Sequence, residues 1–272
     1  MPPMARYRYL LGDSRGEAAR LRFQAKLWDP VSLALFDRLG VKPGMKVLEI
    51  GPGQGSLHLE LRRRVKGPVD AVERSGPFAA RLRRLCARDR RGAGTIWETD
   101  LLNAPLPKEK YDLIFARWVF LFLPEPEKHL RMLARALKPG GRIAIQDYHR
   151  ETMALYPKPK DWDELMAADR RFFESQGGDA SIGGRLPELY KRAGLLPSAA
   201  KAELKTGFPG SDVWTWASWY FLGVMPRLGR IKPFTPGAAR RTSAFWLAAA
   251  KRPSSLFIAP SVLDCVARKP RR

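Results

Sequence analysis

The stretch that decides the fold is Val47-Leu48-Glu49-Ile50-Gly51-Pro52-Gly53-Gln54-Gly55-Ser56-Leu57. A short apolar run with β-branched residues predicts a buried strand, which leads into a glycine-rich turn and then into a helical segment. Gly51 and Gly53 allow the backbone to approach a ligand that Cβ atoms would block. The free N–H groups of the following helix N-terminus suit a carboxylate or a phosphate. The stretch therefore predicts a strand–turn–helix unit that binds a ligand at its turn.

The spacing and charge of this turn distinguish two kinds of ligand. A dinucleotide-binding turn has the pattern G-x-G-x-x-G, whereas here the third glycine comes one residue earlier. Glu49 stands two residues before the first glycine. A pyrophosphate gains nothing from a nearby carboxylate, but a ligand with an ammonium group does. The stretch therefore favours an amino-acid-like ligand over a pyrophosphate.

Strands and helices alternate on either side of this unit. Strands are expected over residues 45–50, 69–73, 95–99, 111–115 and 142–146, and helices over residues 56–65, 77–91 and 125–137. This alternation predicts a doubly wound parallel α/β sheet with its ligand above the carboxyl ends of the strands. Residues 21–39 also have helical spacing, with Pro30 expected to break the helix or begin a new one.

The pattern changes after residue 150. Helices are expected over residues 161–176 and 186–193, a strand over residues 202–206, and one or two strands over residues 255–269. Residues 207–254 are rich in Trp, Pro and Arg, and no acidic residue occurs between residues 213 and 263.

The order of the motifs resembles that of the class I S-adenosylmethionine-dependent methyltransferases. The pattern h-h-E-h-G-x-G-x-G is similar to motif I of that family. Glu73 follows Gly51 by 22 residues, and Asp100 follows the third expected strand in ETDLLNAPLP. The run YDLIFARWVFLFLPEPEKHLRMLARALKPGGRIAIQD resembles the fourth strand, crossover helix and fifth strand of the family. The resemblance covers about residues 20–150 and implies S-adenosylmethionine as the cofactor.

The resemblance also implies a set of cofactor-binding residues. Glu73 would hold the ribose hydroxyls, and Asp100 would lie near the adenine amino group. The segment from Tyr9-Leu10-Leu11-Gly12 to Gln24 resembles a helix that closes over the cofactor in small-molecule members, with Gln24 as the contact. The expected cofactor-binding residues are Gln24, Glu49, Gly51, Gly53, Gln54, Gly55, Glu73, Arg74, Asp100, Leu101, Arg117 and Trp118.

The fold implied is α/β: a doubly wound, mostly parallel seven-stranded sheet (Rossmann-like) with a helical cap. Four segments are expected. Residues 1–40 form an N-terminal helical segment that closes over the cofactor, and residues 41–206 form the Rossmann-like methyltransferase core. Residues 207–254 form an aromatic and basic cap insertion, and residues 255–272 supply the last strand or strands and a basic tail.

The sequence predicts the cofactor as one molecule but the methyl acceptor only as a broad chemical class. Family members that methylate base nitrogens often carry an N/D-P-P-Y/F motif after the fourth strand, and Ala116–Phe120 does not match it. The layout is closer to members that act on small molecules, quinones or natural products. In the cap, Trp214, Trp216 and Phe221 are candidates for a substrate pocket. Aromatic residues interleaved with arginines suit a flat, apolar, anionic acceptor, a membrane surface or single-stranded nucleic acid. The alternative is that they are cap core and a solvated basic face.

Methyl transfer is an in-line displacement that depends mainly on positioning, so a general base is optional. If there is a base, the candidates are Asp147, Tyr148 and His149, which follow the fifth strand. A surface role for these three residues is equally compatible with the sequence. The other two histidines, His58 and His129, fall on expected helices and are predicted to be structural or solvated. No metal site is predicted, because the three histidines form no ligand pattern.

Composition limits the class of protein. Lys and Arg number 49 and Asp and Glu 27, which gives a net charge of +22 and a sequence pI near 10.5. Two distant cysteines exclude a disulfide framework and favour the cytoplasm. The N-terminus does not resemble a secretory signal, and the longest apolar run, residues 213–225, is shorter than the ~18–20 residues that span a bilayer.

The main functional prediction is S-adenosylmethionine-dependent methyl transfer to a small-molecule acceptor that is aromatic, lipid-like or anionic. An RNA methyltransferase that uses the basic surface is one alternative, and a non-catalytic cofactor-binding protein is another. Nucleic acid is the less favoured partner, and the sequence does not predict an oligomeric state.

Overall fold

Strand β1 (Val47–Ile50) lies in the middle of a seven-stranded sheet. The computed structural model describes residues 15–271, with side chains from Arg20 onward. The strand order is β3-β2-β1-β4-β5-β10-β7, and every neighbouring pair is parallel except the two that include β10. The other six strands are β2 (Asp70–Val72), β3 (Ile96–Trp97), β4 (Tyr111–Arg117), β5 (Leu137–His149), β7 (Leu196–Glu203) and β10 (Ser261–Arg268). The doubly wound, mostly parallel seven-stranded sheet expected from the sequence is therefore confirmed.

The register places β1 at the point where the strand order reverses. Glu49 of β1 pairs with Ala71 of β2 on one side and with Phe115 of β4 on the other. Connections leave β1 and β4 in opposite directions, which opens a crevice above their carboxyl ends. The glycine-rich turn follows β1 directly and so borders this crevice.

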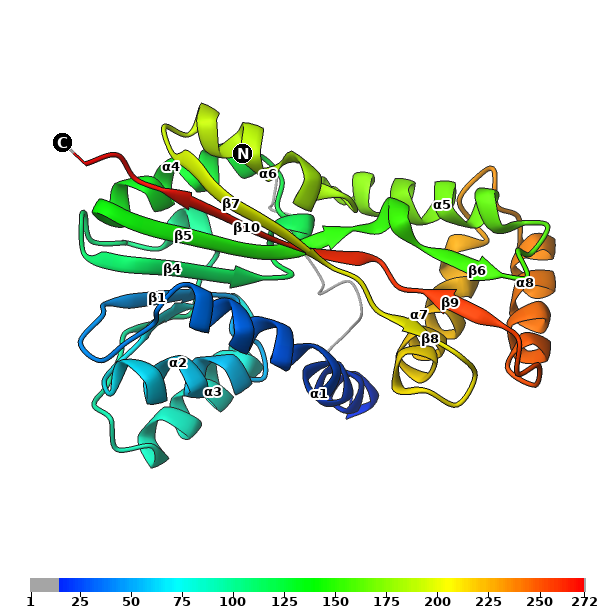
Figure 1. Cartoon of the computed structure of the whole chain (residues 1–272), viewed down its shortest axis with the longest axis horizontal. Helices are drawn as coiled ribbons and strands as arrows, with labels where there is room; N and C mark the ends of the chain where they lie inside the picture. The colour runs from blue at the N-terminus through cyan, green and yellow to red at the C-terminus, as the bar shows by residue number, and fades with distance from the viewer. Residues whose placement is uncertain (1–14, 272) are drawn as a thin grey trace.

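Helices cover both faces of the sheet (Figure 1). The C-terminal half of α1 (Arg15–Arg38) and α2 (Ser56–Val65) bury Leu35 and Leu61 with Phe115 of the sheet in one apolar cluster. On the opposite face, α4 (Pro126–Ala136) and α6 (Ile182–Arg192) bury Leu133 and Leu186 in a second cluster. Helix α3 (Gly76–Arg88) follows β2 and contacts β3. These helices fix the strand ends from which the functional residues project.

The remaining elements form a layer at one end of the molecule, which we call the cap (Figure 1). Its three-stranded antiparallel sheet has the order β6-β9-β8, and three helices pack beside that sheet. The cap consists of β6 (Ala154–Tyr156), α5 (Trp162–Glu174), β8 (Thr206–Gly207), α7 (Asp212–Leu228), α8 (Pro236–Ala249) and β9 (Leu256–Ile258). Its core is aromatic, with Trp246 5.0 Å from Phe221 and 5.5 Å from Phe257 between ring centroids. The cap thus includes β6 and α5, which precede the insertion expected at residues 207–254.

Two sequence-based expectations about elements were wrong. Helix α1 continues through Pro30 without ending there, and buried residues on both sides of the proline, Trp28, Leu35 and Phe36, anchor it to the rest of the chain. Strand β5 begins at Leu137, five residues before the strand expected at residues 142–146, and includes Pro139-Gly140-Gly141, with an irregular register at that place.

Candidate functional site

A cavity of about 1540 Å³ lies above the carboxyl ends of β1, β2 and β4 and extends under the cap. We call its two halves the strand end and the cap end. The strand end is lined by the glycine-rich turn, by the residues after β2 and by the 3-10 helix η1 (Leu101–Asn103). The cap end is lined by residues that follow β4 and β5 and by residues of α5 and α7. Both ends therefore belong to one continuous space.

The glycines of the turn have different roles. Gly51, Gly53 and Gly55 all have positive φ values, 65°, 53° and 84°. A Cβ on Gly51 would lie 2.6 Å from Cγ2 of Val119, whereas a Cβ on Gly53 would meet no atom within 4 Å. Gly55 does not line the cavity. It stands at the start of α2, where a Cβ would lie 3.0 Å from Leu82 and 3.1 Å from Leu85 of α3, so helix packing also requires a glycine here.

Glu73 is fixed beside the turn by backbone donors. The Gly53 N–H donates to Oε2 at 3.0 Å, and the Ser75 N–H donates to Oε1 at 2.8 Å. The side chain is buried, and burial raises the pKa of this carboxyl although the two N–H groups oppose the shift. A carboxylate accepts several hydrogen bonds, and Glu73 lines the cavity. It is therefore placed to accept hydrogen bonds from ligand hydroxyl groups.

Asp100 and Arg74 lie on the same side of the strand end. Oδ1 of Asp100 accepts a hydrogen bond from the Leu102 N–H at 3.1 Å, which caps η1. Its Oδ2 is 3.8 Å from Nη1 of Arg74. Leu101 and Gln54 complete this wall of the cavity. The wall combines a carboxylate with apolar surface. This combination suits a heteroaromatic ring, which has apolar faces and polar groups at its edge.

Glu49 lies at the base of the cavity and contacts a buried histidine. Its Oε2 is 2.9 Å from Nδ1 of His58, and both side chains are buried. Burial alone would lower the pKa of His58, but hydrogen bonding with Cys86 and Glu49 outweighs it and raises the pKa to about 9. His58 is thus a buried partner of the cavity carboxylate, as the structural alternative for this residue predicted.

Arg117 and Trp118 form the boundary between the two ends. Nη2 of Arg117 donates to Asp29 at 2.7 Å and Nη1 donates to Ser32 at 3.0 Å, which ties β4 to α1. The guanidinium lies 4.6 Å from the Trp118 ring centroid. Trp118 has a φ of 54° and stacks on Tyr148 at 5.3 Å with an interplanar angle of 19°.

Gln24 joins α1 to the cap. Its Oε1 accepts hydrogen bonds from Nη1 of Arg20 at 2.7 Å and from Nε1 of Trp216 at 3.2 Å. All three side chains line the cavity. The segment Tyr9–Gly12, also expected over the cofactor, lies outside the described residues.

Asp147, Tyr148 and His149 were expected to follow the fifth strand, but they are the last three residues of β5, which continues to His149. The fold separates their side chains. Asp147 is fully buried beneath the cavity wall, where it accepts hydrogen bonds from the N–H groups of Leu121 at 3.1 Å and Tyr148 at 2.9 Å. Burial raises the pKa of Asp147 to about 7. His149 lies 4.0 Å from Glu151 and is not part of the cavity lining. Of the three, only Tyr148 lines the cavity, and burial raises the pKa of its hydroxyl, so it keeps its proton at neutral pH.

The cap candidates are also separated. Trp216 and Phe221 line the cavity, whereas Trp214 faces the cap core and packs on Trp246 at 5.1 Å. Several residues of the cap end were not predicted from the sequence because they belong to no motif: Arg150, Met153, Phe172, Phe173 and Tyr220. Arg150 directly follows the candidate run of Asp147, Tyr148 and His149, which was the one available signal.

Arg150 is the charged residue among those missed. Its Nε and Nη2 donate to Asp169 at 2.8 and 3.0 Å, and Oη of Tyr220 donates to the same carboxylate at 2.6 Å. Arg150 and Asp169 are both buried. The pair links the segment after β5 to α5 and α7.

Neither a metal-ligand cluster nor a membrane-spanning helix occurs in the part of the chain that the structure describes. No group of three His, Cys, Asp or Glu residues there is arranged to hold a metal ion. No helix among residues 15–271 is both long and apolar enough to cross a bilayer.

The donors and acceptors of the strand end fit S-adenosylmethionine. Gly53 leaves open space that a Cβ would occupy, Glu73 offers carboxylate oxygens to hydroxyl groups, and Glu49 places a second carboxylate by the turn. With the doubly wound sheet, this site defines the class I S-adenosylmethionine-dependent methyltransferases, the class that the sequence resembles.

Comparison with known proteins supports this class. Residues 48–145 match the family model of a methyltransferase domain. Methyltransferase GfsG of Streptomyces halstedii is 31% identical over 119 residues, which cover 42% of this chain and 41% of that protein. Ubiquinone/menaquinone biosynthesis C-methyltransferase UbiE of Idiomarina loihiensis is 30% identical over 140 residues, or 50% of this chain and 55% of that protein. The chain thus spans about half the length of these curated relatives.

The fold likeness extends over more of the chain than the sequence likeness. The YcgJ protein from Bacillus subtilis has a TM-score of 0.62 and 16% sequence identity, with 89% of this chain and 99% of that chain covered. Residues 48–145 therefore form a methyltransferase domain, which confirms the predicted class and cofactor, and the fold likeness extends to most of the rest of the described chain.

Proposed function

We propose that the protein transfers the methyl group of S-adenosylmethionine to a small-molecule acceptor bound at the cap end of the cavity. The observation that carries this proposal is the continuity of the cavity, which extends from the glycine-rich turn and Glu73 to the aromatic residues under the cap. An acceptor in this space is next to the cofactor site and lies under the cap, which covers part of the cavity.

The cofactor supplies an electrophilic methyl group when it is bound. The residues of this chain position the two ligands and exclude water, and positioning alone accounts for a large part of such rate accelerations. The Tyr148 hydroxyl keeps its proton and Asp147 lies beneath the wall of the cavity. The mechanism we propose therefore assigns no general base to the residues at the end of β5.

The lining favours a flat, apolar acceptor. Aromatic rings dominate the cap end and come from the segment after β4 and from β5, α5 and α7: Trp118, Phe122, Tyr148, Phe172, Phe173, Trp216, Tyr220 and Phe221. UbiE, which is named for C-methylation in quinone biosynthesis, is among the relatives of this chain. Arginines at the cap end are consistent with an anionic acceptor. We place the reaction in the cytoplasm because both cysteines are free thiols.

Calorimetry with S-adenosylhomocysteine tests the cofactor assignment. We expect binding to the wild type and loss of binding to Gly53→Asp, because the new carboxylate would lie next to Glu73. Methyl transfer is then measured as S-adenosylhomocysteine release with a panel of phenols, quinones and aromatic carboxylates. Absence of S-adenosylhomocysteine binding would contradict the proposal. Binding without transfer to any acceptor would favour the non-catalytic alternative.

The RNA alternative rests on the net charge of +22. Part of the basic surface lies on α3, whose Arg83 pairs with Glu98 at 2.6 Å. Arg241 of the cap is paired with Asp161 at 2.8 Å. Because these arginines are already paired with carboxylates, we favour the small molecule, and keep a membrane surface as a further partner to test with anionic vesicles.

A further inference from the structure

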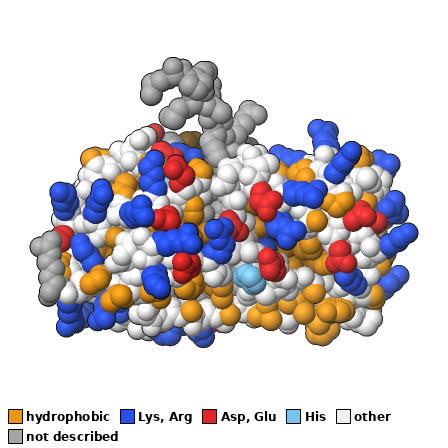
Figure 2. All heavy atoms as spheres, turned by 90° about the horizontal axis from the view of Figure 1, so that it is seen from above, with side chains coloured by type: hydrophobic (Ala, Val, Ile, Leu, Met, Phe, Trp, Pro, Cys, Tyr) orange, Lys and Arg blue, Asp and Glu red, His pale blue; other side chains and the backbone are white. Residues whose placement is uncertain are grey.

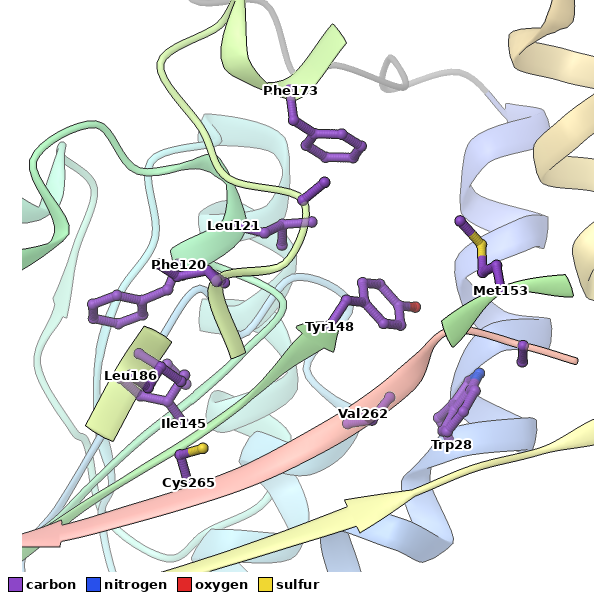
Figure 3. Close-up of a cluster of buried hydrophobic side chains, with 14 of the residues drawn as sticks. Trp28, Phe120, Leu121, Ile145, Tyr148, Met153, Phe173, Leu186, Val262 and Cys265 are labelled. Carbon is purple, nitrogen blue, oxygen red and sulfur yellow. The ribbon is translucent and has the colours of Figure 1, made fainter. Parts of the chain in front are cut away.

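Tyr148 presents an unused hydroxyl at the cap end. The residue lines the cavity and is 6% exposed. Its Oη forms no hydrogen bond to any side chain or backbone group between residues 15 and 271, while its backbone N–H is satisfied by Asp147. The ring is held in place by stacking on Trp118. Figure 3 shows the hydroxyl at the end of β5, turned toward the side on which Met153 lies.

Arg150 presents a second unused donor nearby. Asp169 engages Nε and Nη2, and Nη1 makes no hydrogen bond within the described part of the chain. The side chain lines the cavity and is 7% exposed. Its guanidinium carbon lies 5.7 Å from the Tyr148 ring centroid and 4.7 Å from that of Tyr220. Asp169 and the flanking rings fix the guanidinium, so its remaining edge has a set direction.

Covering two such donors with a ligand that has no acceptor atom is costly. Neither atom is among the enclosed polar atoms without a partner, so both open onto the cavity. An apolar ligand that covers them removes their access to water and gives nothing in return, so a ligand that supplies an acceptor atom is favoured. Arginine can only donate, and a protonated tyrosine hydroxyl is a good donor. Around them the wall is aromatic and apolar, which selects the rest of the ligand.

We propose that Tyr148 Oη and Arg150 Nη1 bind oxygen of the methyl acceptor, which is a planar apolar molecule bearing a carboxylate or carbonyl group. This inference rests on the proposed function, since it names the acceptor chemistry for the same cavity. It assigns acceptor-binding roles to both residues and no proton transfer to either.

The test compares three probes of similar shape: 2-naphthoate, 2-acetylnaphthalene and 2-ethylnaphthalene. Each is measured by equilibrium dialysis against protein saturated with S-adenosylhomocysteine. We expect at least one oxygen-bearing probe to bind the wild type about tenfold or more tightly than 2-ethylnaphthalene, as a hydrogen bond to a charged or buried donor implies. Preference for 2-naphthoate identifies a carboxylate, and preference for 2-acetylnaphthalene identifies a carbonyl.

Two variants test the donors. Arg150→Lys retains the charge opposite Asp169 but lacks Nη1, and Tyr148→Phe removes only the hydroxyl. Each is expected to weaken the preferred oxygen-bearing probe by about tenfold and to change 2-ethylnaphthalene by less than about twofold. Tyr148→Phe keeps the test valid if Arg150→Lys does not fold, because it leaves the Arg150–Asp169 pair intact.

Matched controls exist elsewhere in the chain. Arg241→Lys alters a similar two-bond pair, with Asp161 at 3.0 and 2.8 Å. Tyr190→Phe removes a buried hydroxyl that donates to the Cys265 carbonyl at 2.9 Å. Neither Arg241 nor Tyr190 lines the cavity, so both variants should leave the probe preference unchanged.

The two proposals fail in different ways. If the wild type does not bind S-adenosylhomocysteine, the proposed function fails. If it binds S-adenosylhomocysteine but shows no preference for an oxygen-bearing probe, the acceptor inference alone is overturned. The same holds if both variants keep the wild-type preference.

Discussion

Gly51 and Gly53 are two residues apart and have similar positive φ values, yet their surroundings differ. Alanine at Gly53 is expected to cost only the free energy of holding a residue with a Cβ at a positive φ, about 1 kcal/mol. Alanine at Gly51 has the same backbone cost, and its Cβ would also lie 2.6 Å from Val119. This overpacking adds about 1–3 kcal/mol. We expect urea unfolding to show Gly51→Ala as clearly less stable than Gly53→Ala. Equal losses of stability would contradict the contact with Val119.

Asp147 makes stability depend on pH. Burial raises its pKa from 3.8 to about 7, against the opposing effect of backbone N–H groups. Because the folded state holds the proton more tightly than the unfolded state, the stabilising contribution is complete below 3.8 and is lost as the pH rises toward 7. The melting temperature of the wild type should therefore fall relative to that of Asp147→Asn between about pH 5 and pH 8.

A difference between the two melting temperatures that stays constant over this range would show that Asp147 is ionised throughout. Tyr148→Phe is a suitable comparison, since it alters the adjacent cavity residue and leaves the carboxyl in place. Its melting temperature should follow the pH dependence of the wild type.

Elements with a one-sided or continuous apolar pattern were predictable from the sequence, and the others were not. Strand β1, helix α2 and strand β4 were found because their apolar residues are buried at regular spacing. Strand β7 was expected over residues 202–206 but begins at Leu196, since nearly all of its side chains are exposed and show no alternation. Strands β6 and β8, of three and two residues, are too short for a pattern.

For the candidate site, too, residues were predictable only where the local sequence pattern determines their position. Glycines and carboxylates at the ends of strands could be assigned because the chain direction fixes where a strand ends. Trp214 and Trp216 could not be told apart, because α7 is apolar around much of its surface and only its packing decides which side meets the cavity. The position of the Arg150 side chain is fixed by Asp169, which also binds Tyr220, and both residues come from elements distant in the sequence. Apart from its place directly after His149, the sequence near Arg150 therefore gives no sign of its position in the cavity.

The contact between α1 and α7 is expected to depend on aromatic packing. Trp28 is 1% exposed and lies 5.8 Å from Trp216 between ring centroids. Lys26 and Asp212 also pair across these helices at 3.2 Å, but their side chains are 70% and 51% exposed. We expect Trp28→Ala to lower the free energy of unfolding by about 3–5 kcal/mol and Lys26→Ala by less than about 0.5 kcal/mol. Urea denaturation of the two variants measures both values.

At the scale of the whole molecule, the positive charge is spread over the surface. Figure 2 shows Lys and Arg side chains distributed across one face and interspersed with Asp and Glu. Many arginines are in ion pairs, such as Arg64 with Glu60 at 2.7 Å. A net charge of +22 still attracts polyanions at low salt. The charge is therefore expected to cause weak association that does not depend on the cavity.

Salt dependence separates this association from the chemistry of the site. Binding of poly(U) should weaken steeply between about 50 and 300 mM NaCl, since it depends on release of counterions. S-Adenosylhomocysteine affinity should change by less than about twofold over the same range, because its contacts lie inside a partly enclosed cavity where screening is weaker. Glu73→Ala should abolish S-adenosylhomocysteine binding and leave poly(U) binding unchanged. RNA binding that resists salt and competes with S-adenosylhomocysteine would instead place RNA in the cavity and support the RNA methyltransferase alternative.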